Sequence, residues 1–330
     1  MPRTRSSAIF GMFLLALLMR IPAAGQTQPT QPQPNAATPS QESPSGEPLD
    51  DPNNPTLRVR TDLVNVIFTV TDKHGKFVRD LKQDEFRILD NNLPPKSISS
   101  FEAETNLPLR VGLLIDASNS IRDRFQFEQQ AAIEFLQQII RPRSDQAFVL
   151  AFDELWELTQ DFTSDLDRLQ KGVRVIRPGG GTAMWDAVYY ACRDKLQKTK
   201  EAGPVRRAII LVSDGDDNQS RVLRQEAIEM AQRAEVIIYT ISTNLTTSSN
   251  DQGDKNLKML AEATGGRAFF PFKLEQVTDA FRDIQDELRS QYAVAYKPEQ
   301  MAANGQFRTI KIIPDNKKFQ VRAKRGYFAK

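Results

Sequence analysis

Three oxygen-bearing side chains recur at every second position in the stretch "LLIDASNSI", residues 113–121. They are Asp116, Ser118 and Ser120, and they follow directly after an apolar run. Such a run is typical of a buried strand, so the three side chains stand where the strand ends. Carboxylate and hydroxyl oxygens are ligands for hard cations such as Mg²⁺ and Ca²⁺. Taken alone, however, Asp and Ser at a strand-to-helix turn are also ordinary helix caps.

Two further segments carry oxygen donors in comparable positions. The loop "GGGT", residues 179–182, leads into a helix, and "SDG", residues 213–215, ends the apolar run "AIILV". The combined candidate metal ligands are Asp116, Ser118, Ser120, Thr182 and Asp214. All five offer oxygen and none offers nitrogen or sulfur, which favours Mg²⁺, Mn²⁺ or Ca²⁺ over zinc. No Gly-Lys-Ser/Thr follows the glycines, so the loop is not predicted to bind nucleotide phosphates.

The elements that position these residues alternate between strand and helix from residue 106 to 290. Strands are predicted at "LRVGLLID", "QAFVLAFD", "RAIILVSDG", "VIIYTIST" and "RAFFPF", with "WELTQDFT" as an extended partner, and amphipathic helices lie between them. This alternation predicts an α/β fold with a doubly wound, mostly parallel sheet and helices on both faces. Ligands in such folds bind at the carboxyl ends of the strands. We refer to residues 106–290 as the middle domain.

Segments on both sides of the middle domain have the period of β-strands. Residues 57–105 alternate around apolar positions in "LRVRTDLVNVIFTVTD", and residues 291–330 do so in "QYAVAYKP", "QFRTIKIIP" and "FQVRAKRGYF". A few strands do not close a sandwich alone. We therefore expect 57–105 and 291–330 to form one β-sandwich-like domain, the β-module, into which the middle domain is inserted. The simpler alternative is two separate β-segments that flank the middle domain.

The first 56 residues carry the pattern of an exported protein. Arg3 and Arg5 precede the apolar run "AIFGMFLLALLM", which is followed by Ala23-Ala24-Gly25. This order predicts a signal peptide over residues 1–25, and therefore a secreted or periplasmic, envelope-associated protein without a stable membrane span after cleavage. The alternative is an uncleaved anchor, although the apolar run is short for a bilayer span. Residues 26–56 are rich in Pro and Gln and predict a disordered linker.

Composition excludes or disfavours several functions. The chain of 330 residues has a formal net charge of +2, which gives no support to nucleic-acid binding. A single cysteine, Cys192, excludes an internal disulfide, and a single histidine, His74, disfavours a His-rich zinc site or a Ser-His-Asp triad.

Residues near the proposed ligands are given ordinary structural roles. Asp186 is expected in the first turn of a helix, where the helix dipole favours an acidic side chain. Asp216 and Asp217 are expected on a solvated loop, where they add negative potential near the ion. Trp156 and Trp185 are expected in the core.

The stretch "DASNS", followed by Thr182 and Asp214, resembles the metal-ion-dependent adhesion site of von Willebrand factor type A domains over about residues 108–290. The whole chain, including "VTDKHGKFVRDLKQDEFRILD" and the C-terminal "GYFA", resembles the related proteins common in Acidobacteria. The resemblance implies that Ser118 and Ser120 coordinate the metal directly, and that Thr182 does so in the ligand-competent state. It also implies that Asp116 and Asp214 act largely through bound water and hydrogen bonds, and that an Asp or Glu of a partner protein completes the octahedron.

The predicted function is an exported, metal-ion-dependent binding or adhesion module that coordinates a partner's carboxylate, and not an enzyme. One alternative is a metal-dependent hydrolase that uses the same ion as a Lewis acid, although the cluster contains no histidine or lysine to serve as general base. Another is a factor for envelope assembly or a chaperone-like partner. The sequence leaves the oligomeric state open.

Overall fold

The computed structural model describes residues 63–104, 107–119, 122, 125–199, 205–244, 252–300 and 304–329. All of them belong to one compact unit, Arg60–Lys330. The signal peptide and linker predicted over residues 1–56 lie outside the described residues, as does the proposed ligand Ser120.

The middle domain is built on a six-stranded sheet with the strand order β6-β5-β4-β7-β8-β9. The strands are β4 (Leu109–Asp116), β5 (Gln146–Phe152), β6 (Trp156–Thr163), β7 (Arg206–Ser213), β8 (Val236–Ser242) and β9 (Ala268–Phe269). Neighbouring strands are parallel except for β6, which pairs antiparallel with β5 at one border of the sheet. We call the edge where the parallel strands end the carboxyl edge, and the opposite one the amino edge.

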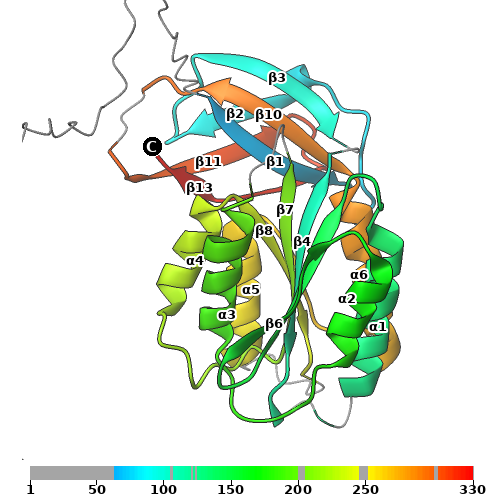
Figure 1. The fold of residues 1–330 in the computed structure, drawn as a ribbon. Helices are drawn as coiled ribbons and strands as arrows, with labels where there is room; N and C mark the ends of the chain where they lie inside the picture. The colour runs from blue at the N-terminus through cyan, green and yellow to red at the C-terminus, as the bar shows by residue number, and fades with distance from the viewer. Residues whose placement is uncertain are drawn as a thin grey trace, which may run out of the picture. The chain divides into compact units, whose positions relative to one another are not determined.

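Helices cover both faces of this sheet (Figure 1). One layer holds α1 (Phe125–Ile139), α2 (Leu166–Arg174) and α6 (Leu274–Leu288); the other holds α3 (Met184–Tyr190), α4 (Arg224–Arg233) and α5 (Gln252–Thr264). A π-helical segment, Ala191–Leu196, continues α3. Two apolar cores result, and successive residues of β4 enter them in turn: Leu113 packs in one core and Leu114 in the other. The apolar runs of the central strands are therefore explained by burial on both faces.

The flanking segments form two antiparallel sheets. The first has the order β12-β1-β10-β3 and the second the order β13-β11-β2. The strands are β1 (Val64–Thr71), β2 (Phe86–Asp90), β3 (Ser97–Glu104), β10 (Gln291–Lys297), β11 (Phe307–Pro314), β12 (Gln320–Ala323) and β13 (Gly326–Phe328), with a short 3₁₀ helix at Gln83–Glu85. β1 lies between β10 and β12, so strands from both ends of the described chain share one sheet. Between the sheets, Phe68, Phe86 and Tyr292 pack in a common apolar core.

This arrangement confirms the predicted fold class, a doubly wound α/β sheet accompanied by a small β-structure. Two local predictions were wrong. The expected strand "RAFFPF" is reduced to the two residues of β9. Trp156, expected in the core, begins the border strand β6 and is 39% exposed, whereas Trp185 is buried as expected. Among the helices that the structure describes, none is long and apolar enough to cross a membrane.

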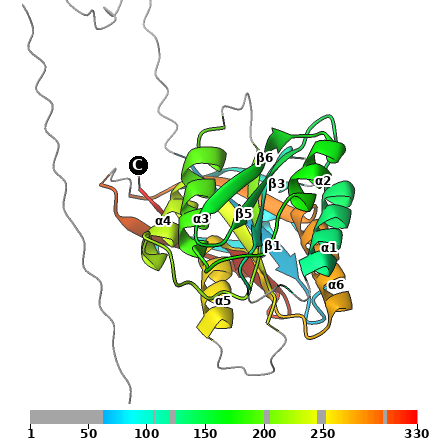
Figure 2. The same cartoon turned by 60° about the horizontal axis from the view of Figure 1, so that its bottom comes forward.

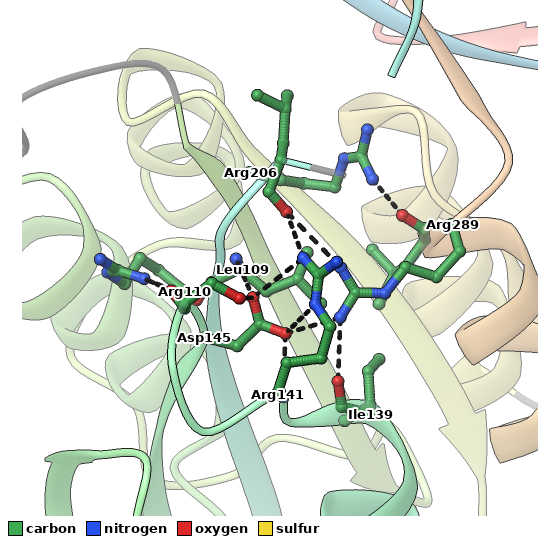
Figure 3. Close-up of polar contacts among 10 residues, drawn as sticks. Leu109, Arg110, Ile139, Arg141, Asp145, Arg206 and Arg289 are labelled. Atoms are coloured by element: carbon green, nitrogen blue, oxygen red, sulfur yellow. Dashed lines mark hydrogen bonds and ion pairs between the residues drawn. The ribbon is translucent and has the colours of Figure 1, made fainter. Parts of the chain in front are cut away.

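A buried carboxylate organises the amino edge of the sheet (Figure 3). Asp145 accepts hydrogen bonds from Leu109 N at 2.9 Å, Arg141 Nε at 3.0 Å and Arg289 Nη2 at 2.6 Å. Burial on its own raises the pKa of Asp145, but the hydrogen bonds from Arg141, Leu109 and Arg289 outweigh it and lower the pKa to about 2. The start of β4 is thereby tied to the ends of α1 and α6.

A second buried carboxylate joins the last helix to the β-module. Glu287, near the end of α6, is fully buried and forms an ion pair with Arg322 of β12. The other carboxylate oxygen, Oε1, accepts hydrogen bonds from Tyr239 Oη at 3.1 Å and Thr69 Oγ1 at 3.4 Å. Three separate segments of the chain thus meet on one side chain at the base of α6.

Candidate metal centre

The first segment of the site is the end of β4. Asp116 is fully buried, and both of its carboxylate oxygens are hydrogen-bonded. Oδ1 accepts the backbone N–H of Ser118 at 2.8 Å, and Oδ2 accepts the hydroxyl of Ser213 at 2.6 Å. The first bond folds the chain back directly after the strand, and the second ties β4 to its neighbour β7. Asp116 therefore holds the turn that carries Ser118.

The second segment is the glycine loop, residues 179–182, which is bound to the end of β4 by backbone contacts. Gly179 N donates to Ala117 O at 2.7 Å, and Asn119 N donates to Gly180 O at 3.4 Å. Gly180 has a φ of +67°, and a Cβ at this position would lie 2.9 Å from Glu154 Cγ. The left-handed backbone favours glycine here, and a Cβ would also displace the exposed Glu154 side chain.

Thr182 ends the glycine loop and is buried. Its backbone N–H donates to Asn218 Oδ1 at 3.0 Å, and its carbonyl accepts the backbone N–H groups of Asn218 and Gln219, each at 3.0 Å. These contacts attach the glycine loop to the loop that follows β7. Thr182 is thereby held between the first and third segments of the site.

The third segment is the loop after β7, which begins with Asp214. This residue is only 7% exposed, and its Oδ1 accepts the backbone N–H of Asp216 at 3.1 Å. The carbonyl of Asp214 accepts Asn244 Nδ2 at 2.9 Å, and the carbonyl of Gly215 accepts Asn256 Nδ2 at 3.1 Å. The loop is thus anchored to the chain that follows β8 and to α5.

The electrostatics of the site disfavour a second negative charge. Burial raises the pKa of Asp116 to about 6, and the charge of Asp214 acts in the same direction, whereas the hydrogen bonds from Ser213 and Ser118 act against it. A bound divalent cation would favour the charged form of both carboxylates.

Four of the five predicted ligand residues lie at this carboxyl edge: Asp116, Ser118, Thr182 and Asp214. The fifth, Ser120, lies outside the described residues. Within the described part of the chain, no group of three or more His, Cys, Asp or Glu side chains could hold a metal ion. The donor set therefore fits a cation only if hydroxyl oxygens supply part of the coordination, as is usual for hard cations.

Several residues that support the site were not predicted. Ser213 positions Asp116, and Asn218 positions Thr182. Of these two, only Ser213 has a sequence signal, since it directly precedes Asp214 in "VSDG". Asp217 was expected on a solvated loop, but its side chain is half-buried and accepts the backbone N–H of Trp185 at 3.0 Å, in the first turn of α3. Asp186 does lie in that first turn, and its Oδ1 accepts the backbone N–H of Val222 at 2.8 Å.

Comparisons with known proteins agree with this architecture. A family model described as von Willebrand factor type A domain matches residues 111–287. The human protein "von Willebrand factor A domain-containing protein 3B" is 30% identical over 168 residues, which are 48% of this chain and 11% of that protein. The chain therefore spans about a tenth of that relative.

Solved structures show a more distant likeness. BatB from Bacteroides thetaiotaomicron is 16% identical, with a TM-score of 0.45, over 55% of this chain and 100% of that one. Proximal thread matrix protein 1 from the mussel byssus, in a structure with a zinc-occupied MIDAS motif, is 14% identical with a TM-score of 0.49. That match covers 61% of this chain and 50% of the mussel protein.

Proposed function

Because this chain belongs to the von Willebrand factor type A domain family, we propose that its middle domain is a metal-ion-dependent binding module. The site would hold one divalent cation, Mg²⁺ or Mn²⁺ with Ca²⁺ as a further candidate, through the hydroxyls of Ser118, Ser120 and Thr182. The observation that carries this proposal is that three loops converge at one buried edge and are joined there by hydrogen bonds. These bonds link Ala117 with Gly179 and Thr182 with Asn218.

The two carboxylates have a supporting role in this proposal. Both oxygens of Asp116 already accept hydrogen bonds, and Asp214 Oδ1 accepts one from the backbone of its own loop. They would neutralise the charge of a divalent ion while acting mainly through hydrogen bonds and bound water. An ion surrounded by neutral hydroxyls remains electrophilic, so it would take a further carboxylate from a partner protein.

Binding is favoured over catalysis by the chemistry of the side chains at the site. Hydrolysis at a metal would need a general base within hydrogen-bond reach of the attacking water. The single histidine, His74, lies in an exposed turn of the β-module, and Asp116 is engaged in fixing Ser118 and β7. With His74 away from the site and Asp116 occupied by structural hydrogen bonds, the site is better suited to holding a ligand than to activating water.

Titration calorimetry of the full chain with Mg²⁺ and with Mn²⁺ tests the metal site. Asp214→Asn should abolish measurable binding, because it removes a buried negative charge from the site. Asp216→Ala is the matched control: this exposed neighbour should change affinity by about threefold or less, since solvent and salt screen its charge. Equal affinities for the parent protein and Asp214→Asn would contradict the proposal.

A partner can be sought by capture from an envelope extract, first with Mg²⁺ and then with EDTA. A protein held through a carboxylate on the metal should be released by the chelator. Retention of the same partner in EDTA would show that the contact does not pass through the metal.

We also propose that the module acts outside the cytoplasm, as the order of basic, apolar and small residues in 1–25 predicts. Mass analysis of the mature N-terminus should find a protein that begins near Gln26. An intact Met1 in the membrane fraction would instead support the anchor alternative.

A further inference from the structure

The most exposed apolar side chains lie at the carboxyl edge of the sheet, which also holds the proposed metal site. Among the described residues, the four large apolar side chains with the highest exposure are Leu155 at 73%, Leu223 at 67%, Val175 at 58% and Phe272 at 58%. Each lies on a connection at the carboxyl edge: Leu155 between β5 and β6, Leu223 before α4, Val175 after α2, and Phe272 after β9. Figure 2 turns this edge toward the viewer. Apolar surface concentrated on one face is typical of a site for protein contacts.

One of these connections touches the metal site itself. The carbonyl of Asp153 accepts the backbone N–H of Ala183, the residue after Thr182, at 2.6 Å. Glu154 Cγ packs against Gly180 so closely that a Cβ there would lie at 2.9 Å. Leu155 is the next residue of this connection.

The connection between β5 and β6 is also rigid. Asp153 N donates to Leu155 O at 2.9 Å, and Leu155 N donates back to Asp153 Oδ1 at 3.2 Å. Trp156 stacks on Tyr190 of α3, with ring centroids 3.6 Å apart and an angle of 15° between the rings. An aromatic ring fixed on one face and partly exposed on the other loses little conformational freedom when a ligand covers it.

One exposed carboxylate adjoins this apolar pair. Glu154 directly precedes Leu155 and is exposed, whereas Glu157 faces the other side of β6: Trp156 pairs with Phe152 and Glu157 with Ala151, which pack in separate cores. Glu154 forms no ion pair with another residue in the part of the chain that the structure describes. A partner that covers the pair would therefore be expected to place a cationic side chain beside Glu154.

We infer that Leu155 and Trp156 form the apolar half of a docking surface whose polar half is the metal site. The partner is a protein segment that presents an Asp or Glu to the metal, a large apolar side chain to Leu155 and Trp156, and a Lys or Arg to Glu154. A small free carboxylate would leave the apolar pair uncovered, and an anionic lipid surface would meet Glu154 with charge of the same sign. This inference rests on the proposed metal-dependent function and adds the chemistry of the partner.

The test is selection of phage-displayed random peptides on the full chain in Mg²⁺, with elution by EDTA. Eluted sequences should combine an acidic residue with a nearby large apolar residue and a Lys or Arg. The affinity of a selected peptide should fall about tenfold in Leu155→Ser, because the variant buries less apolar surface on binding. Leu93→Ser is the matched control, since Leu93 is an exposed leucine of the β-module, 39% exposed, and its loss should leave affinity unchanged.

The remaining outcomes separate this inference from the function on which it rests. Acidic peptides without an apolar preference, or equal binding by Leu155→Ser, would overturn the inference and leave a metal-dependent binding module. Failure to select any EDTA-sensitive peptide would overturn both. The chain should also not bind vesicles of anionic phosphatidylglycerol. If it does bind them, and Leu155→Ser abolishes that binding, the apolar pair is assigned to a lipid surface instead.

Discussion

Ser213 Oγ donates a hydrogen bond of 2.6 Å to Asp116 Oδ2, and so joins the ends of the two central strands of the sheet. The two residues are 97 positions apart in the sequence. The hydroxyl of Ser213 in turn accepts the backbone N–H of Gly215 at 3.0 Å. One serine therefore positions both the turn after β4 and the loop that begins with Asp214.

Ser213→Ala should weaken Mn²⁺ binding about tenfold, because a hydrogen bond to a buried carboxylate is lost. Titration calorimetry measures this change. The matched control is Ser144→Ala at the amino edge, where Ser144 Oγ donates to Oδ1 of the buried Asp145 at 3.0 Å. If Ser144→Ala weakens metal binding equally, the effect comes from a general loss of stability rather than from the bond to Asp116.

Gly180→Ala should reduce metal affinity, since the left-handed backbone of the glycine loop disfavours a Cβ, and that Cβ would also displace the Glu154 side chain from the loop. The left-handed backbone adds a cost of about 1 kcal/mol. Gly75 has a similar φ of +80°, but a Cβ there meets nothing within 4 Å. Gly75→Ala should therefore lower the free energy of unfolding by about 1 kcal/mol and leave metal affinity unchanged. Calorimetry and urea unfolding of both variants separate backbone strain from displacement of the loop.

The free energy of unfolding should fall in acid through Asp145. The pKa of its carboxyl is lowered to about 2 in the folded protein, below the value near 3.8 of an unperturbed carboxyl. The folded state therefore binds this proton less tightly than the unfolded state does. The resulting stabilisation, about 2 kcal/mol, is present above pH 4 and is lost as pH falls from about 4 to about 2.

Urea unfolding of the parent protein and of Asp145→Asn between pH 6 and pH 2 measures this contribution. The difference in stability between the two should shrink as pH falls through that window. A difference that stays constant with pH would show that Asp145 acts by packing and hydrogen bonding in a manner independent of its charge.

The ion pair between Glu287 and Arg322 should contribute far more to the free energy of unfolding than the exposed pair between Arg325 and Glu262. Arg322→Met leaves a fully buried carboxylate without its cation and should lower the free energy of unfolding by about 3 kcal/mol. Arg325 pairs with Glu262 of α5 in a largely exposed position, so Arg325→Met should change the free energy of unfolding by about 1 kcal/mol or less. Similar losses in urea unfolding would indicate that Glu287 is not the anchor of α6.

Strong local patterns made the central strands predictable. Residues such as Leu113 and Leu114 must both be apolar because each faces a separate core, and a continuous apolar run follows. The ends of these strands then place Asp116 and Asp214 at one edge. The resemblance of the motif to a known family supplied the roles proposed for the serines.

What the sequence did not reveal depends on contacts between distant segments. The Ser213–Asp116 bond requires the register that sets Ile115 beside Val212, and no local pattern contains it. Trp156 was expected in the core because its type is usually buried, but a border strand leaves one side of its ring uncovered. The length of β9 was overestimated for a related reason, since Phe270 and Phe272 continue its apolar pattern into an exposed loop.

The position of β1 between β10 and β12 also constrains how the protein is made. Asp90 and its partner Tyr296 are 206 positions apart, so the first strands of the β-module leave the ribosome long before their partners. At about 5–20 residues per second, that interval is on the order of ten seconds or more. During this time the apolar side chains of β1, among them Val66 and Phe68, have no sheet to join. An unpaired apolar strand is prone to aggregate, so the nascent chain needs protection until its last strands emerge.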